Sequence, residues 1–148
     1  MDSLTPDTRH LATRVERPAR DVYAFASNPA NLPAWAAGLA EGIAETDGRW
    51  IAESSLLGRV EVVFAPANEF GVLDHDVTLP TGETVPNPVR VIPDGPAACD
   101  VVFTLRRRAH MTDAEFRRDA ATVTDDLGRL KHLLEGRRGE PASPVAAG

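Results

Sequence analysis

The chain has 148 residues, of which 43% are hydrophobic, and its formal net charge is −6. A chain of this length suits one domain that buries roughly 70% of its unfolded surface. Basic residues are spread along the chain or paired with acids, which argues against a nucleic-acid-binding surface. Cys99 is the only cysteine, so an intramolecular disulfide and a cysteine-rich metal site are excluded.

Membrane proteins and metal-dependent or cofactor-dependent enzymes are also disfavoured. No apolar run approaches the roughly 18 residues of a membrane span, and the N-terminus lacks a signal-peptide apolar region, so a cytoplasmic protein is expected. No two histidines stand at positions i and i+4, and no metal site is expected. The sequence contains no dinucleotide fingerprint, phosphate-binding glycine loop or nucleophile elbow, and no cofactor is expected. The histidines are His10, His75, His110 and His132.

The N-terminal part predicts one strand and two short helices. Residues 1–7 are polar and expected to be loose, and residues 9–16 alternate weakly, as a strand does. Pro18 suits the start of a short helix, which ends before Pro29 because the residue that precedes a proline avoids the helical region. A second short helix is expected over residues 29–39, with Asn28 as its N-cap.

From residue 41 to residue 108 the pattern is that of β-strands. Turn signals recur every 8–15 residues, which indicates antiparallel connections. Pro86 and Pro88 lie two residues apart in one expected strand, so their missing N–H groups face the same neighbour. The ladder on that side must break, at an edge or a bulge. The run Arg106–Arg108 is interpreted as a solvated strand end. The expected strands surround Ile43 or cover residues 50–54, 60–64, 72–79, 83–92 and 101–105.

A long amphipathic helix is predicted from Thr112 to about Glu135, with a capping box at its start and Gly136 at its end. Residues 137–148 are expected to be disordered. The element order predicts an α+β domain over residues 8–136, in which a curved antiparallel sheet packs on this helix. The apolar residues of the helix recur in steps of 4 and 3, which keeps them in one stripe: Phe116, Ala120, Val123, Leu127, Leu130 and Leu134.

After the first strand the chain reads Arg17-Pro-Ala-Arg-Asp-Val-Tyr-Ala-Phe-Ala-Ser-Asn-Pro-Ala-Asn-Leu-Pro-Ala-Trp35. This segment resembles the START-like helix-grip superfamily (SRPBCC), in particular its polyketide cyclase/dehydrase-like branch, and residues 69–82 are similar to a hallmark of a small bacterial subgroup. The resemblance implies a helix-grip fold, in which a curved antiparallel sheet of about seven strands wraps around a long C-terminal helix, with two short helices after the first strand. It also implies a deep cavity between sheet and helix, which often holds an apolar or aromatic ligand.

His75 is the candidate catalytic residue. In the expected strand it shares a face with apolar side chains and projects inward, while Asp74 and Asp76 point to solvent. In an apolar cavity it would act as a hydrogen-bond partner or as a general acid/base near neutral pH. The alternative is a core histidine whose ring is satisfied by the backbone or by another strand.

The other candidate ligand-binding residues come from several elements. Trp35 falls where the resemblance places the cavity mouth, either as a flexible gate or as a core anchor. Asn87 faces inward by alternation, and its partner is His75, a ligand, or a backbone group exposed by the prolines. The remaining candidates carry no reactive group, and line the cavity or fill the core: Phe64, Phe103, Phe116, Ala120 and Val123.

Three acidic residues are interpreted as non-catalytic. Glu53 is solvated if Trp50 and Ala52 face inward, which is the favoured arrangement, although the side of Trp50 is not fixed by the sequence. Asp119 and Asp126 flank the apolar stripe of the long helix and are interpreted as rim charges rather than buried acids.

Three functions remain open, because members of the superfamily range from lipid carriers to co-chaperones and the fold does not choose among them. The first is binding of a small hydrophobic or aromatic molecule, with His75 and Asn87 as polar contacts. The second is a cofactor-independent polyketide cyclase/dehydratase-type enzyme that uses His75 as general acid/base. The third is a protein-interaction or stress-response module with a filled cavity. A homodimer also remains open, and the dispersed histidines disfavour an iron-dependent oxygenase.

Overall fold

The computed structural model describes residues 7–136. The tail expected to be disordered, residues 137–148, lies outside the described residues, and so does the N-terminal segment expected to be loose, apart from Asp7. Asp7 is held in place, because its carbonyl accepts the Arg107 amide at 2.8 Å and its carboxylate pairs with the Arg107 side chain at 3.2 Å.

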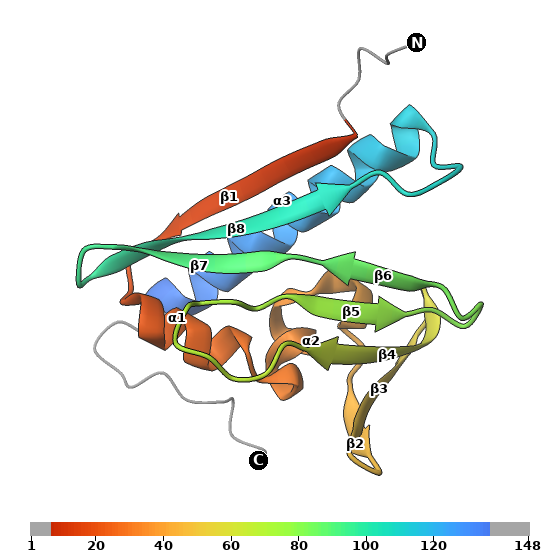
Figure 1. Cartoon of the computed structure of the whole chain (residues 1–148), viewed down its shortest axis with the longest axis horizontal. Coiled ribbons are helices and arrows are strands. Elements are labelled where there is room, and N and C mark those ends of the chain that lie inside the picture. The colour runs from red at the N-terminus through yellow and green to blue at the C-terminus, as the bar shows by residue number, and fades with distance from the viewer. Residues whose placement is uncertain (1–6, 137–148) are drawn as a thin grey trace.

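The long helix is α3 (Asp113–Glu135), and its buried residues are the six of the predicted stripe. The capping box is confirmed: the Thr112 hydroxyl accepts the Glu115 amide at 3.1 Å, and the Glu115 carboxylate accepts the Thr112 amide at 2.9 Å. Gly136 is the C-cap, as predicted. Figure 1 shows α3 crossing behind β1, β7 and β8, so that the sheet covers the stripe.

Within residues 7–136, eight strands form a curved antiparallel sheet around α3 (Figure 1). Their pairing divides them into a three-stranded part, in the order β1-β8-β7, and a five-stranded part, in the order β2-β3-β4-β5-β6. The count exceeds the expected seven because the strand predicted over residues 83–92 is divided at Pro88. The bounds are β1 Thr8–Val15, β2 Ala44–Thr46, β3 Arg49–Ser54, β4 Gly58–Phe64, β5 His75–Thr78, β6 Thr84–Asn87, β7 Val89–Asp94 and β8 Ala98–Arg106.

The division at Pro88 opens the sheet between β6 and β8. Backbone groups of this segment alternate between two neighbours: the Val89 carbonyl accepts the Leu73 amide at 2.8 Å, and the Pro88 carbonyl accepts the Thr104 amide at 2.9 Å. Pro86 and Pro88 therefore face β8 without an N–H to donate. β8 pairs with β7 and β6 pairs with β5, but β6 and β8 do not pair. The predicted break in the ladder is confirmed.

Asp74 corrects two expectations. The strand predicted over residues 72–79 is regular only in β5, because the Asp74 carboxylate, rather than a backbone carbonyl, accepts the Val89 amide at 2.9 Å. The same carboxylate pairs with Arg90 at 2.8 Å and is half-buried, so Asp74 does not simply point to solvent. The Arg90 guanidinium holds the pKa of Asp74 below its ordinary value. Asp76 is exposed, as predicted.

The first predicted short helix is α1 (Ala19–Ala26), which packs against β7 and β8. The second is not one helix but consists of η1 (Pro29–Asn31), α2 (Leu32–Trp35) and η2 (Ala37–Leu39). Pro33 has no N–H to donate to the Pro29 carbonyl, and Ala36 is extended, at φ −98° and ψ 110°. The helical segment is therefore interrupted at these two places. The Asn28 side chain caps η1, as predicted.

Polar residues of the Arg17–Trp35 motif hold helix ends in place. Arg17, which is 3% exposed, donates to the Leu134 carbonyl at the C-terminal end of α3 at 2.8 Å. Asn31, which is 1% exposed, donates to the Phe25 carbonyl at the end of α1 at 2.9 Å. Terminal carbonyls of a helix lack intrahelical partners, and these side chains supply them. The motif therefore specifies the fold rather than a reaction.

Candidate functional site

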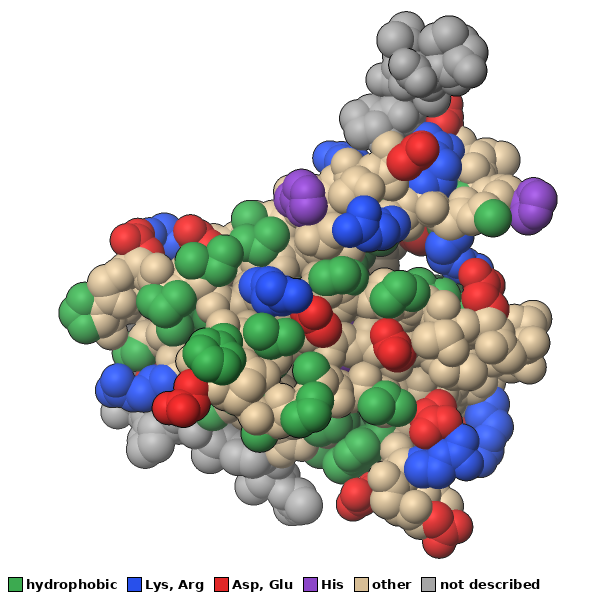
Figure 2. Space-filling view, viewed as in Figure 1, with side chains coloured by type: hydrophobic (Ala, Val, Ile, Leu, Met, Phe, Trp, Pro, Cys, Tyr) green, Lys and Arg blue, Asp and Glu red, His purple; other side chains and the backbone are tan. Residues whose placement is uncertain are grey.

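A pocket of about 260 Å³ lies between the sheet and α3. β6 and β8 both line it, so the prolines that open the ladder stand where the pocket is found. In Figure 2 the surface is notched between the end of β8 and the β5–β6 hairpin. Most of the lining side chains are apolar, among them Leu32, Leu39, Leu57, Val77, Leu79, Val85, Leu105 and Leu127.

Five of the candidate ligand-binding residues line this pocket: Trp35, His75, Asn87, Phe103 and Val123. The other three candidates lie outside its lining. Phe116 and Ala120 are buried further towards the N-terminus of α3, where the Arg107 guanidinium covers the Phe116 ring at 4.9 Å. Phe64 stands behind His75, and the two rings stack with their centroids 4.8 Å apart.

The protonation state of His75 follows from its contacts. Its Nδ1 lies 3.0 Å from the Leu73 carbonyl, which can only accept, so the proton of the neutral imidazole belongs on Nδ1. Burial lowers the pKa of His75 below its ordinary 6.5, and the Leu73 contact and nearby Asp74 oppose this shift. The ring is therefore neutral at pH 7, and Nε2 is left as an acceptor or base.

Asn87 stands opposite His75 in the β5–β6 ladder, and both residues line the pocket. Its Nδ2 donates to the Val85 carbonyl at 3.2 Å. The observed partner of the Asn87 side chain is therefore a backbone carbonyl of its own strand.

Trp35 is held by α3 rather than free to swing. The Arg129 Nε donates to the Trp35 carbonyl at 3.2 Å, and the Asp126 carboxylate accepts the Ala37 amide at 3.1 Å. Arg129 also pairs with Asp126, so the two side chains fix the α2–η2 segment from both sides of Ala36. Trp35 itself is 4% exposed. These contacts favour the core anchor over the flexible gate.

The acids of α3 differ from the rim charges that the sequence suggested. The Asp126 side chain is 16% exposed, and burial raises its pKa while the Ala37 amide and Arg129 oppose that shift. Asp119 is half-buried, and burial raises its pKa as well. Both carboxylates line the pocket. They were missed as pocket groups because they flank the apolar stripe and their surroundings come from distant segments. Asp126 meets Ala37 of the α2–η2 segment, and Asp119 lies near Arg108.

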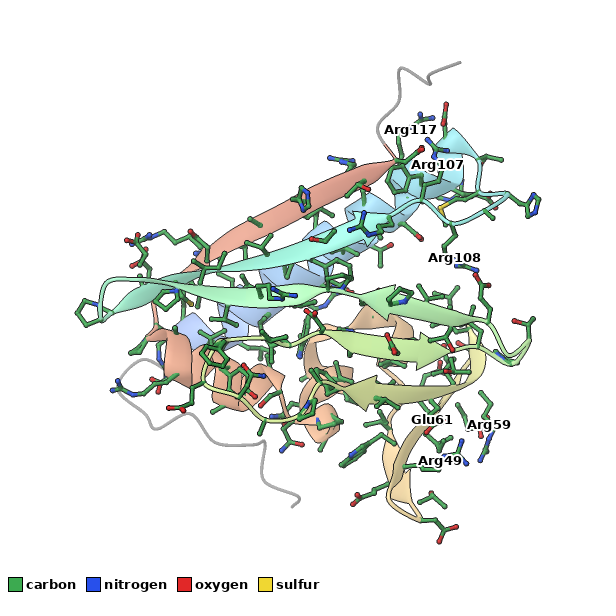
Figure 3. The ribbon with its side chains drawn as sticks, in the orientation of Figure 1. Arg49, Arg59, Glu61, Arg107, Arg108 and Arg117 are labelled. Carbon is green, nitrogen blue, oxygen red and sulfur yellow. The ribbon has the colours of Figure 1, made fainter. Side chains whose placement is uncertain are left out.

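The run Arg106–Arg108 is not simply a solvated strand end. Arg107 is largely buried, between Asp7 and Asp113. Figure 3 shows Arg108 reaching from the end of β8 towards the β5–β6 turn, where Glu83 accepts its Nη2 at 3.1 Å. Arg108 lines the pocket, and its Nε is buried without a hydrogen-bond partner among the described residues. Nothing in the residue pattern distinguished these arginines.

Glu53 is exposed and pairs with Arg59 at 2.5 Å, while Ala52 is buried, which confirms the favoured arrangement. Figure 3 shows Arg49, Arg59 and Glu61 together on β3 and β4, away from Arg108 and the pocket mouth. Glu61 pairs with Arg49 at 2.5 Å. This cluster is a network of exposed ion pairs on the outer side of the sheet.

Metal binding, cysteine chemistry and membrane insertion each require particular side chains or segments, and residues 7–136 can be compared with these requirements. That range contains no group of three His, Cys, Asp or Glu side chains placed to hold a metal ion. Cys99 is buried, and burial raises the pKa of its thiol to about 11, so it is a poor nucleophile at neutral pH. No helix in the same range is long and apolar enough to span a membrane.

The lowered pKa of His75 predicts a pH-dependent stability. The unfolded chain binds a proton at His75 near pH 6.5, whereas the folded chain binds it only at lower pH. The stability that this difference provides is complete above pH 6.5 and is lost as the pH falls through the folded pKa. Urea denaturation of the wild type and of His75→Gln from about pH 7.5 to about pH 5 should show the steeper loss in the wild type. Parallel curves would contradict a lowered pKa.

A second prediction concerns the bond between Asp126 and the Ala37 amide. Asp126→Asn keeps an oxygen acceptor for this amide, whereas Asp126→Ala removes it. We predict that Asp126→Ala is less stable than Asp126→Asn by about 1 kcal/mol, measured by urea denaturation, and that it alone shifts the Trp35 fluorescence. Equal stabilities would mean that this bond does not fix the α2–η2 segment.

No model of a known protein family and no curated protein matches the sequence. Solved structures do match. The protein XoxI from Bacillus cereus has a TM-score of 0.67 at 9% identity, over 86% of this chain and 95% of that chain. The di-domain ARO/CYC BexL has a TM-score of 0.67 at 16% identity, and the match covers 86% of this chain and 46% of BexL. A truncated norcoclaurine synthase from Thalictrum flavum has a TM-score of 0.61 at 13% identity, and the match covers 90% of this chain and 98% of that chain. At identities this low the TM-scores show a shared fold and nothing further, and this fold is a helix-grip fold.

Proposed function

We propose that the protein binds a small hydrophobic or aromatic ligand in the pocket between the sheet and α3. The observation that carries this proposal is the lining itself, in which apolar side chains surround a few polar groups such as His75 and Asn87. Ligand sites of small molecules have this composition. The volume of about 260 Å³ falls just under the roughly 300–1,000 Å³ of drug-sized sites, which suits a ligand of one or two fused rings.

The mouth of the pocket supports the same proposal. Leu56 and Leu57, in the β3–β4 turn, line the pocket and are 75% and 37% exposed. Apolar side chains that remain exposed at an opening mark a surface that an apolar molecule can cover. The solved structures named as an aromatase/cyclase-type protein and as norcoclaurine synthase support the proposal by analogy of fold alone.

The test is to fill the pocket. Val123 lines it from α3, whereas Ala121, two residues earlier on the same helix, is exposed. Small aromatic molecules such as 2-acetylnaphthalene should raise the melting temperature of the wild type and of Ala121→Phe, but not of Val123→Phe. Native mass spectrometry should likewise show a small molecule retained by the purified wild type and by Ala121→Phe, but not by Val123→Phe. Equal responses of the two variants would place binding elsewhere, and no response in any of them would overturn the proposal.

A cofactor-independent polyketide cyclase/dehydratase-type activity is the second candidate, and the contacts of His75 favour it. An unprotonated Nε2 with a lowered pKa is suited to remove a proton from the carbon next to a carbonyl group. The proton moves to Nε2, giving an imidazolium and an enolate, and returns to carbon or oxygen in the next step.

Exchange of the methyl protons of 2-acetylnaphthalene in D₂O, followed by NMR, separates the two candidates. If His75 is a general base, the wild type should accelerate the exchange, and His75→Ala should lose on the order of 10²–10⁴ of that rate. If the protein only binds, exchange stays at the rate of free solution in the wild type and in His75→Ala alike. The second result would eliminate the enzyme while leaving the binding protein in place.

A further inference from the structure

Two buried side-chain nitrogens lack a hydrogen-bond partner within the described residues, and they are Trp35 Nε1 and Arg108 Nε. Both residues line the same pocket, although they come from α2 and from the segment after β8. Buried N–H groups in folded proteins nearly always find an acceptor, and an unpaired one destabilises the protein. Their coincidence in one pocket indicates that the missing acceptors come from what the pocket holds.

None of the acceptors that line the pocket bonds either nitrogen in the structure. Asp126 accepts the Ala37 amide and pairs with Arg129, and the Glu83 carboxylate accepts Arg108 Nη2. The Nε–H of Arg108 therefore lacks a hydrogen-bond acceptor among the described residues, although the guanidinium forms an ion pair with Glu83. Asp119, His75 and Asn87 also present acceptor atoms to the pocket, but none of them is a hydrogen-bond partner of either nitrogen.

The charge of the lining decides which kind of acceptor fits. The charged residues of the lining balance, with Arg106 and Arg108 against Asp119 and Asp126, and Glu83 adds a carboxylate at the mouth. An anionic ligand would meet these carboxylates in an apolar environment, which weakens its binding. A neutral oxygen meets no such penalty.

We infer that the pocket takes a neutral ligand with carbonyl-type oxygen, for which Trp35 Nε1–H and Arg108 Nε–H are the donors. This inference rests on the proposed binding function and narrows its ligand class. It separates carbonyl-bearing ring compounds from pure hydrocarbons of the same shape and from carboxylates. His75 Nε2 adds an acceptor for a hydroxyl on the same molecule.

Three probes of matched shape test the ligand class: 2-acetylnaphthalene, 2-isopropylnaphthalene and 2-naphthoate. They present a neutral carbonyl, no polar group and an anion on the same two rings. Isothermal titration should show that the ketone binds roughly tenfold more tightly than the hydrocarbon, a ratio that matches about 1.4 kcal/mol. The carboxylate should bind more weakly than the ketone.

Variants test the two donors. Trp35→Phe removes the indole N–H and keeps an aromatic ring, and its matched control is Trp50→Phe, because Trp50 lies on β3 outside the pocket lining. Arg108→Met removes the guanidinium, and Glu83→Gln is its control, because it alters the ion pair and keeps Nε. Loss of the ketone preference in Trp35→Phe or in Arg108→Met, with both controls unchanged, supports the inference. A preference that survives in both variants overturns it.

A spectroscopic readout covers the case in which Trp35→Phe fails to fold. The chain has two tryptophans, so Trp50→Phe leaves Trp35 as the single indole. Its N–H proton should move downfield when the ketone binds and not when the hydrocarbon binds. Ketone and hydrocarbon that bind equally, with no change at the indole, would sink the inference and leave the proposed function intact. Failure of every probe to bind would instead overturn the proposed function, and the inference with it.

Discussion

The absent amide hydrogens of Pro86 and Pro88 are the constraint on which the site depends. Both positions face β8, where a continuous sheet would need donors, and β6 and β8 consequently stay unpaired. The neighbouring chain compensates, since the Asp74 carboxylate takes the Val89 amide just beyond the break. The sheet is therefore continuous where β1, β8 and β7 pair, and open where β6 and β8 stay unpaired. The pocket is found at the open part, lined by β6, β8 and α3.

One apolar stripe on α3 therefore serves two purposes. Phe116 and Ala120 are buried where β1 and β8 lie over the helix, and they act as core. Val123 and Leu127 continue the same stripe and line the pocket. Periodicity cannot distinguish the two groups, because the side chains are alike and only the cover differs. For the same reason the stripe could be predicted in full, while its division into core and pocket could not.

Local rules accounted for much of the fold: the Thr112 capping box, the Asn28 cap and the break at the prolines depend on neighbours in sequence. Strand alternation likewise placed His75 and Asn87 towards the pocket. The side chains that sequence reasoning misjudged, Asp126 and Arg108, take their surroundings from segments distant along the chain. Asp126 lies 89 positions from its partner Ala37. No pattern near either residue records that contact, which arises only when the α2–η2 segment crosses α3.

The pocket is bordered on two sides by contacts between segments, and these contacts differ in the free energy needed to break them. On the α2–η2 side, the Asp126 carboxylate, whose side chain is 16% exposed, accepts the Ala37 amide, and Arg129, at 44% exposed, donates to the Trp35 carbonyl. Across the split, the described chain offers the pair between Arg108 and Glu83, whose side chains are 40% and 49% exposed. Water competes with such an exposed pair and leaves it little net strength, whereas breaking a buried bond strands its partners. The strand ends are accordingly the weaker closure, and the donor that this pair leaves unsatisfied, Arg108 Nε, stands beside the opening.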